Sequence, residues 1–273
     1  MTLRQVFWRI LPLAVPALLV FGCGSGEKAL LEIDFSSAAE WKYLFGANIY
    51  GTSDVADADS QKTYSGSLRA YLQGLPDGAE AGRARFGLRD ITVIAPFFPD
   101  EELEDIQKRL TGLTVSVSEN NISLSDTIGI PGVMSGGWDI MRCITRVMPV
   151  MPNTEMKVGT SWDREQRFPL TVDQGKADGL LYQLFTLDSI YKTETGASAA
   201  AISWVFTYRV SLVDEGAGQT ASRKYPLSGS GRGTAALDLT KKKLLNSKAT
   251  FEVTHSQKNT TELDEVVHFE MIE

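Results

Sequence analysis

The chain has 273 residues, with 27 basic and 34 acidic side chains and a net charge of −7 at pH 7. Nucleic-acid binding requires a cationic surface, and no basic cluster exceeds the three lysines at 241–243, so nucleic acid is not an expected partner. A chain of this length can bury a substantial core in one large domain or two small ones.

Residues 1–22 are predicted to be an export signal and not part of the fold. Arg4 and Arg9 give a positive start, and the apolar run that follows (10–21) is too short for a membrane-spanning helix, which needs ~20 residues. Removal of this segment leaves 25 basic and 34 acidic side chains, a net charge of −9.

The apolar run ends in LVFGC, with Gly22 directly before Cys23. This pattern resembles the lipobox of bacterial lipoproteins. The resemblance implies that Cys23 is lipidated and anchors the chain, and Gly24 implies the outer membrane, facing the periplasm. More than one acyl chain anchors stably, because each buried methylene contributes ~0.8 kcal/mol. Residues 23–30 are then a flexible tether to a β-rich domain at 31–273. A plain secretory signal, with Cys23 unmodified, is the alternative.

A first helix is predicted directly after Pro99, where acidic residues fill the first turn and Lys108 and Arg109 the last. Three residues form its apolar stripe: Leu103, Ile106 and Leu110.

A second helix is predicted at 137–148, between Gly136/Gly137 and Pro149. Its apolar face consists of Trp138, Met141, Ile144 and Met148. Methionine suits a surface that meets varied apolar shapes, so the helix covers either a packed core or an apolar ligand cavity. Cys143 lies off this face and is expected to be a buried, inert thiol.

Most of the remaining chain is predicted to be β-strand, because β-branched and aromatic residues dominate it or alternate with polar ones. A strand is expected at 82–97 and another at 264–273, with hairpins at 113–126, 180–213 and 233–255. The glycine-rich segment 229–234 leads into a strand and not a helix, which argues against a phosphate loop. Its glycines are interpreted as bulges or close backbone approaches.

No cofactor or metal site is expected. His255 and His268, with Glu252 or Glu270, could form a metal site only if neighbouring strands brought them together. Asp54, Asp57 and Asp59 lack the glycine and distal glutamate of an EF-hand. Copper(I) would use sulfur ligands such as Met148 and Met151, but Pro149 breaks the helix between them.

These elements predict a mainly β, antiparallel architecture with two short helices: a curved sheet or half-barrel, with a β-sandwich as the alternative. Segment 64–93 can be aligned with 182–211, and 112–125 with 233–247. The alignment suggests two duplicated meanders, in halves 31–135 and 154–273 joined by the helix at 137–148.

The segment PNTEMKVGTSW (152–162) supplies a further pattern, and Gly231, Gly233 and Asp238 follow it later in the chain. Pro152, Val158, Gly159 and Trp162 resemble a Pro–Val-Gly-x-x-Trp motif in a group of uncharacterised β-rich exported lipoproteins. The resemblance implies an exported β architecture and no particular chemistry.

The sequence therefore predicts a lipid-anchored, non-enzymatic protein of the cell envelope that binds an apolar ligand, such as a lipid, or an envelope protein partner. The second helix would line the ligand site. The alternatives are a structural or assembly lipoprotein with a packed core and, more remotely, a metal-dependent hydrolase that uses the two histidines. A large apolar cavity favours the carrier, and a packed interior favours the scaffold.

Overall fold

The computed structural model describes residues 26–54, 61–76, 82–94, 100–111, 114–118, 121–124, 148–172, 175–212, 227–257 and 260–272. The elements of the N-terminal half are β1 (Lys28–Leu31), the short 3₁₀ helix η1 (Phe35–Glu40), β2 (Lys42–Asp54), β3 (Gln61–Gly74), β4 (Arg83–Ile94), α1 (Asp100–Leu110), β5 (Thr114–Ser118) and β6 (Asn121–Leu124). Those of the C-terminal half are β7 (Thr154–Lys157), β8 (Ser161–Val172), β9 (Gly175–Lys192), β10 (Ser198–Leu212), β11 (Leu227–Asp238), β12 (Lys243–Gln257) and β13 (Thr260–Ile272).

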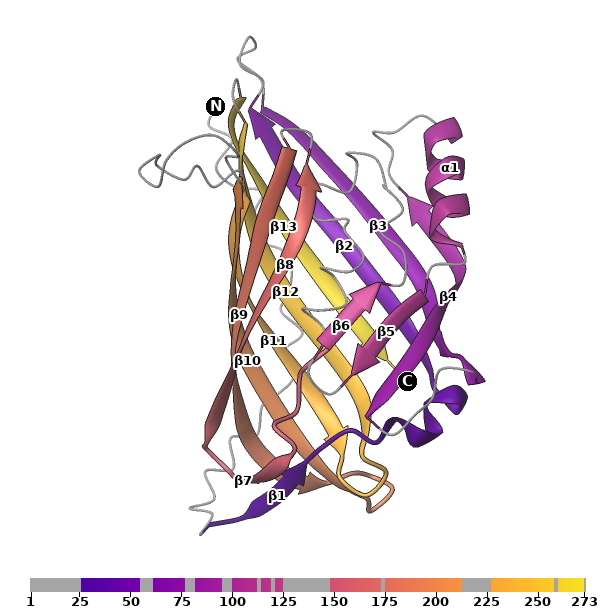
Figure 1. The fold of residues 1–273 in the computed structure, drawn as a ribbon, viewed down its shortest axis with the longest axis vertical. Helices are drawn as coiled ribbons and strands as arrows, with labels where there is room; N and C mark the ends of the chain where they lie inside the picture. The colour runs from indigo at the N-terminus through magenta and orange to yellow at the C-terminus, as the bar shows by residue number, and fades with distance from the viewer. Residues whose placement is uncertain are drawn as a thin grey trace, which may run out of the picture.

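Eleven strands form one antiparallel sheet in the order β6-β5-β4-β3-β2-β13-β12-β11-β10-β9-β8. The sheet curves strongly and stays open, and its edge strands β6 and β8 both lie on the viewer's side of Figure 1. The last strand, β13, pairs with β2 near the start of the chain, and this ladder joins the two halves. Among the described residues, no helix is long and apolar enough to cross a membrane.

The two faces of the sheet differ in burial, as expected for strands that alternate with period two. The inner face carries fully buried side chains, which include Tyr43, Phe45, Phe185, Phe206 and Phe251. The outer face carries the alternate positions, where Leu44, Leu184 and Val205 are exposed. "Inner face" and "outer face" are used below in this sense.

The main expectations about architecture are confirmed. The predicted strands at 82–97 and 264–273 are β4 and β13, the three hairpins are β5–β6, β9–β10 and β11–β12, and the first helix is α1. Because the eleven strands form one sheet, the architecture is the predicted curved sheet and not the alternative β-sandwich. Residues 137–147 of the second predicted helix lie outside the described residues, and Met148 is not helical.

The compared segments fall in two meanders of the same sheet, β3–β6 and β9–β12, with β2 and β13 between them. Their common origin stays a prediction.

Glycines of β11 allow large aromatic side chains to lie flat on the inner face. Gly233 is opposite Trp204 and Gly231 is opposite Phe206 in the β10–β11 ladder. A Cβ at Gly233 would lie 2.2 Å from Trp204 Cζ2, and one at Gly231 would lie 2.4 Å from Phe206 Cζ. The glycines therefore allow a close approach, as expected, and the groups that approach their backbone are the aromatic rings of Trp204 and Phe206.

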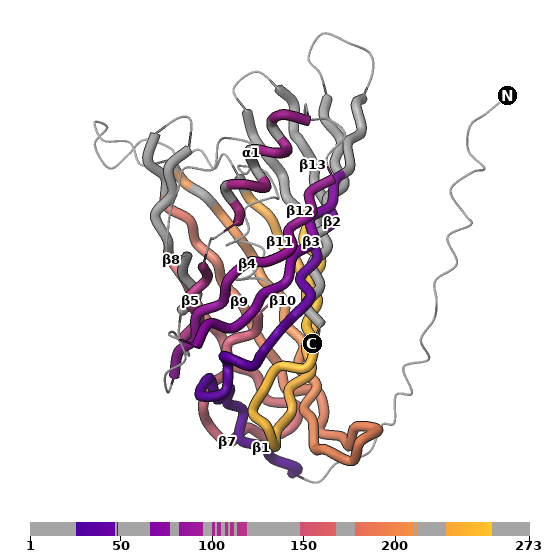
Figure 2. The backbone as a smooth tube through the Cα atoms, turned by 90° about the vertical axis from the view of Figure 1, so that its right-hand side faces the viewer, coloured from indigo at the N-terminus to yellow at the C-terminus, as the bar shows by residue number. Residues whose placement is uncertain are grey.

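One end of the sheet is closed by β1, β7 and η1, which lie together at the bottom of Figure 2. Asp34 caps η1, because its Oδ1 accepts a hydrogen bond of 2.9 Å from Ser36 N. This hydrogen bond lowers the pKa of the Asp34 carboxyl. Lys242 forms an ion pair with Glu32, and their hydrogen bond raises the pKa of Lys242.

The segment before β7 is also fixed to this closed end. Trp162 Nε1 donates a hydrogen bond of 2.8 Å to the carbonyl oxygen of Val150. The Trp162 ring stacks on Phe185, with 5.4 Å between ring centroids. Residues 148–151 therefore lie against the inner face, where Met148 and Met151 are buried.

Gly233→Ala is expected to lower the free energy of unfolding by about 1–3 kcal/mol, because the new methyl group collides with the buried Trp204 ring. Gly46→Ala is the matched control, since a Cβ there meets no atom within 4 Å, and its effect should stay within about 0.5 kcal/mol. Urea denaturation measures both, and equal effects would contradict the packing described here.

Trp162→Phe is expected to cost about 1 kcal/mol of stability, because the ring remains but the hydrogen bond to Val150 is lost. Amide hydrogen exchange within 148–152 should accelerate. Asp163→Asn, at the adjacent exposed position, should change neither quantity; unchanged exchange in Trp162→Phe would show that another contact holds this segment.

Candidate functional site

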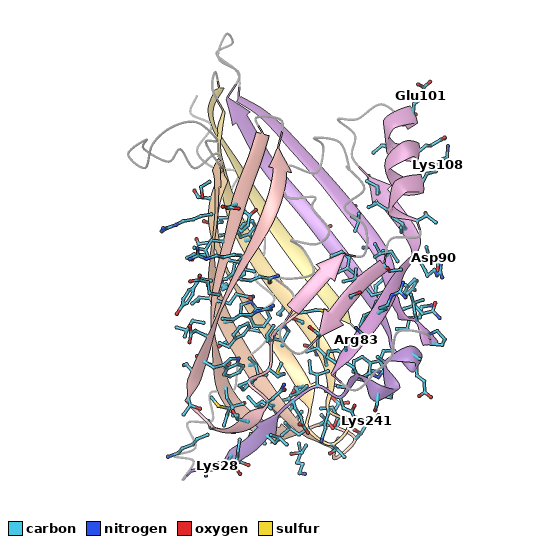
Figure 3. The ribbon with its side chains drawn as sticks, viewed as in Figure 1. Lys28, Arg83, Asp90, Glu101, Lys108 and Lys241 are labelled. Carbon is cyan, nitrogen blue, oxygen red and sulfur yellow. The ribbon has the colours of Figure 1, made fainter. Side chains whose placement is uncertain are left out.

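The inner face is densely packed at the closed end of the sheet. Aromatic side chains form one group around Trp41, which contacts Phe35 and Phe86 at ring-centroid distances of 5.8 and 6.4 Å. A second group centres on Phe185, which lies 5.4 Å from Trp162 and 5.7 Å from Trp204. Both belong to one continuous hydrophobic core. Figure 3 shows the side chains within the sheet, with Lys28 and Lys241 marking the closed end.

Of the four residues predicted to line an apolar ligand site, the structure describes only Met148. It is 4% exposed and belongs to the core. A hollow of about 20 Å³ lies beside it, next to Phe35, Val117 and Met151, and this volume is too small for a lipid. Trp138, Met141 and Ile144 lie outside the described residues, as do Cys23 and Cys143. The lining of the site by this helix therefore stays a prediction.

The register of β12 and β13 separates the two histidines. His268 is paired with Thr250 and His255 with Leu263, so the two positions are five residues apart along the ladder. At the rise of a β-strand this offset is ~16 Å, too long for a shared metal ion. Within the described residues, no three histidine, cysteine, aspartate or glutamate side chains come together as a metal site. Asp57 and Asp59 lie outside the described residues.

Polar side chains interrupt the apolar inner face next to the edge strand β8. Arg164 is paired with Gln183, which is fully buried. Burial lowers the pKa of the Arg164 guanidinium, although arginine stays charged at neutral pH. The inner face next to β8 thus combines an apolar surface with a partly buried cation.

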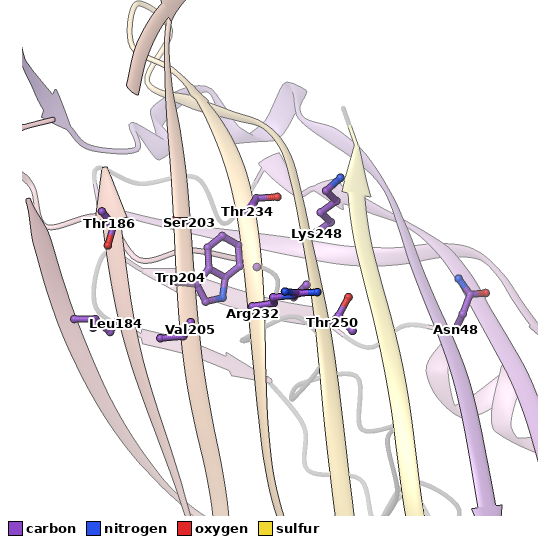
Figure 4. A pocket seen from close by; sticks show the side chains of 12 residues that line it. Asn48, Leu184, Thr186, Ser203, Trp204, Val205, Arg232, Thr234, Lys248 and Thr250 are labelled. Carbon is purple, nitrogen blue, oxygen red and sulfur yellow. The ribbon is translucent and has the colours of Figure 1, made fainter. Parts of the chain in front are cut away.

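A further hollow lies on the outer face, and it was not predicted from the sequence. Its volume is about 520 Å³, and side chains of β9, β10, β11, β12 and β2 line it (Figure 4). The polar lining consists of Asn48, Thr186, Ser203, Arg232, Thr234, Lys248 and Thr250. Leu184 and Val205 supply the exposed apolar part, at 39% and 56% exposure.

The outer hollow is open because its hydroxyl-bearing side chains are short. Ser203 Oγ donates a 3.0 Å hydrogen bond to Asp188 Oδ1 at one side of it. Partial burial raises the pKa of the Asp188 carboxyl. The sequence contains only a weak signal for an apolar site on the outer face. In LLYQLF (180–185) and ISWVFTY (202–208), apolar residues occupy positions of both faces, so some of them lie on the outer face.

Comparisons with known proteins identify no family for this chain. No family model and no curated protein matches the sequence. The chain is similar to the crystal structure of a LolA superfamily protein from Nitrosomonas europaea, with 7% identity, 87% of this chain and 90% of that chain covered, and a TM-score of 0.18. At this TM-score, the similarity carries no inference about the fold or the ligand.

Proposed function

We propose that the chain is an exported, lipid-anchored and non-enzymatic protein of the cell envelope that binds an apolar ligand within its curved sheet. The ligand would lie on the inner face, beyond the packed closed end. The proposed anchor is a lipid on Cys23, held in the outer membrane with the sheet in the periplasm.

The observation that supports this proposal is the continuous register of β8, β9 and β10 beyond Tyr208, at positions occupied by apolar or small residues. In β10, the buried residues that the structure describes include Ile202, Trp204, Phe206 and Tyr208, and the register continues without a shift to positions 210 and 212. Position 210 of β10 is paired with 179 of β9, which is paired in turn with 168 of β8. In the next row, position 212 is paired with 177, and 177 is paired with 170. The residues in these two rows are Val210, Gly179, Phe168, Leu212, Ala177 and Leu170. All are apolar or small by residue type, and in this proposal their two rows supply the apolar surface for the ligand.

A structural or assembly lipoprotein is the second candidate, and the dense packing of the closed end favours it. A protein with that role would hold no lipid, and its outer surface would contact the partner. The two candidates differ in whether the protein extracted from membranes contains a bound apolar molecule.

Val210→Glu is expected to lower the lipid occupancy of the purified full-length protein at least tenfold, because a carboxylate in an apolar site is costly to desolvate. Native mass spectrometry after mild extraction measures the occupancy. Thr207→Glu places the same charge at an exposed position of β10 and should leave occupancy unchanged. A wild-type spectrum without ligand, and no uptake of added fatty acid, would exclude the carrier; circular dichroism checks that both variants fold.

Cys23→Ser is expected to abolish incorporation of labelled fatty acid and to release the protein from the membrane fraction, because the acylated thiol is lost. Cys143→Ser retains Cys23 and serves as the control, which should remain labelled and membrane-bound. Labelling of Cys23→Ser, or release of both variants, would contradict the proposed anchor.

A further inference from the structure

The outer hollow has an apolar part and a cationic part that lie side by side in one row of the sheet. Leu184 is paired with Val205, and Val205 is paired with Arg232 in the next ladder. Neighbouring strands are ~4.8 Å apart, so the backbone positions of Leu184, Val205 and Arg232 span ~10 Å across three strands. A ligand that lies across these strands would meet an apolar surface first and a cation next.

Two cations stand on the cationic side, Arg232 on β11 and Lys248 on β12, and Figure 4 shows both around the hollow. Arg232 is opposite Thr250 and Lys248 is opposite Thr234, so the two are diagonal neighbours across one ladder. Within the part of the chain that the structure describes, neither has an ion pair or side-chain hydrogen bond. Direct cross-strand neighbours of Arg232 are neutral on both sides, whereas Lys248 also faces position 270, a glutamate, on β13.

The charge of these residues contrasts with that of the protein. The chain carries an excess of acidic side chains, so an exposed cation pair beside exposed leucine and valine is a local exception. A guanidinium binds carboxylate and phosphate oxygens in a bidentate manner, and an adjacent ammonium adds a second charge. The hydroxyl group of Thr234 can donate to the same oxygens.

We propose that the outer hollow is a second binding site, which takes a single-chain amphiphile with a phosphate or carboxylate head. The head binds Arg232 and Lys248, and the apolar tail lies on Val205 and Leu184. The volume of about 520 Å³ lies within the range of small-molecule sites. This site is distinct from the apolar surface of the inner face, because its side chains lie on the opposite face of the sheet.

The test is isothermal titration calorimetry of the full-length protein in zwitterionic nanodiscs, with empty nanodiscs subtracted. Octyl phosphate is the probe, octyl glucoside is its uncharged counterpart, and inorganic phosphate lacks the tail. Octyl phosphate should bind more tightly than either. Arg232→Gln with Lys248→Gln should weaken octyl phosphate binding roughly tenfold or more. Val205→Asn should weaken it as well, through the tail.

Arg69→Gln removes an exposed cation outside the hollow and should leave the affinity for octyl phosphate unchanged. Val210→Glu, which targets the inner face, should also leave it unchanged, so the two proposals fail independently. The proposal of a second site would be overturned if octyl phosphate and octyl glucoside bound with equal affinity. It would also be overturned if Arg69→Gln lowered the affinity for octyl phosphate as much as the double variant does. Binding to anionic vesicles without binding of monomeric octyl phosphate would overturn it too.

Discussion

The antiparallel ladder between β2 and β13 is the contact on which the rest of this structure depends. It pairs positions 44–53 with 263–272 and thereby connects a meander from the start of the chain with one from its end. Without this ladder, each meander would present its own unpaired edge and a separate apolar face. With it, eleven strands share one curved surface, and the packed core extends from η1 and β4 to β8.

A single curved sheet has two faces with different physical demands. On the inner face, the aromatic groups around Trp41 and Phe185 fill the closed end, and the proposed ligand would lie further along the strands. On the outer face, a row of short hydroxyl side chains (Thr186, Ser203 and Thr234) lies beside the row of Leu184, Val205 and Arg232, and both rows line an open hollow. β9 and β10 therefore contribute to both proposals, through different residues on the two faces of the same strands.

Curvature and packing are linked through β11. Glycine at 231 and 233 removes the side chain that would otherwise occupy the inner face, and aromatic rings of β10 take that space. The rings in turn bury surface that a flat sheet with ordinary side chains would leave partly open. Glycine usually weakens a strand, and here the aromatic neighbours compensate for that loss.

Local patterns in the sequence were enough to predict most of the elements. Period-two alternation identified the β9–β10 and β11–β12 hairpins, and the charges and apolar spacing after Pro99 identified α1, because these signals depend only on neighbours along the chain. The pairing of β2 with β13 had no such signal, since it joins residues more than 200 positions apart.

The candidate sites show the same division. The sequence identified His255 and His268 as a possible pair, but only the register of β12 and β13 showed that five positions separate them. It also directed attention to the methionines near 148, whereas the outer hollow brings together Leu184, Val205 and Arg232 from three strands. The sequence by itself determined strands, turns and one helix, because these follow from local periodicity. Tertiary structure decided which strands became neighbours, and with them which side chains share a face, because register and curvature depend on contacts between distant segments.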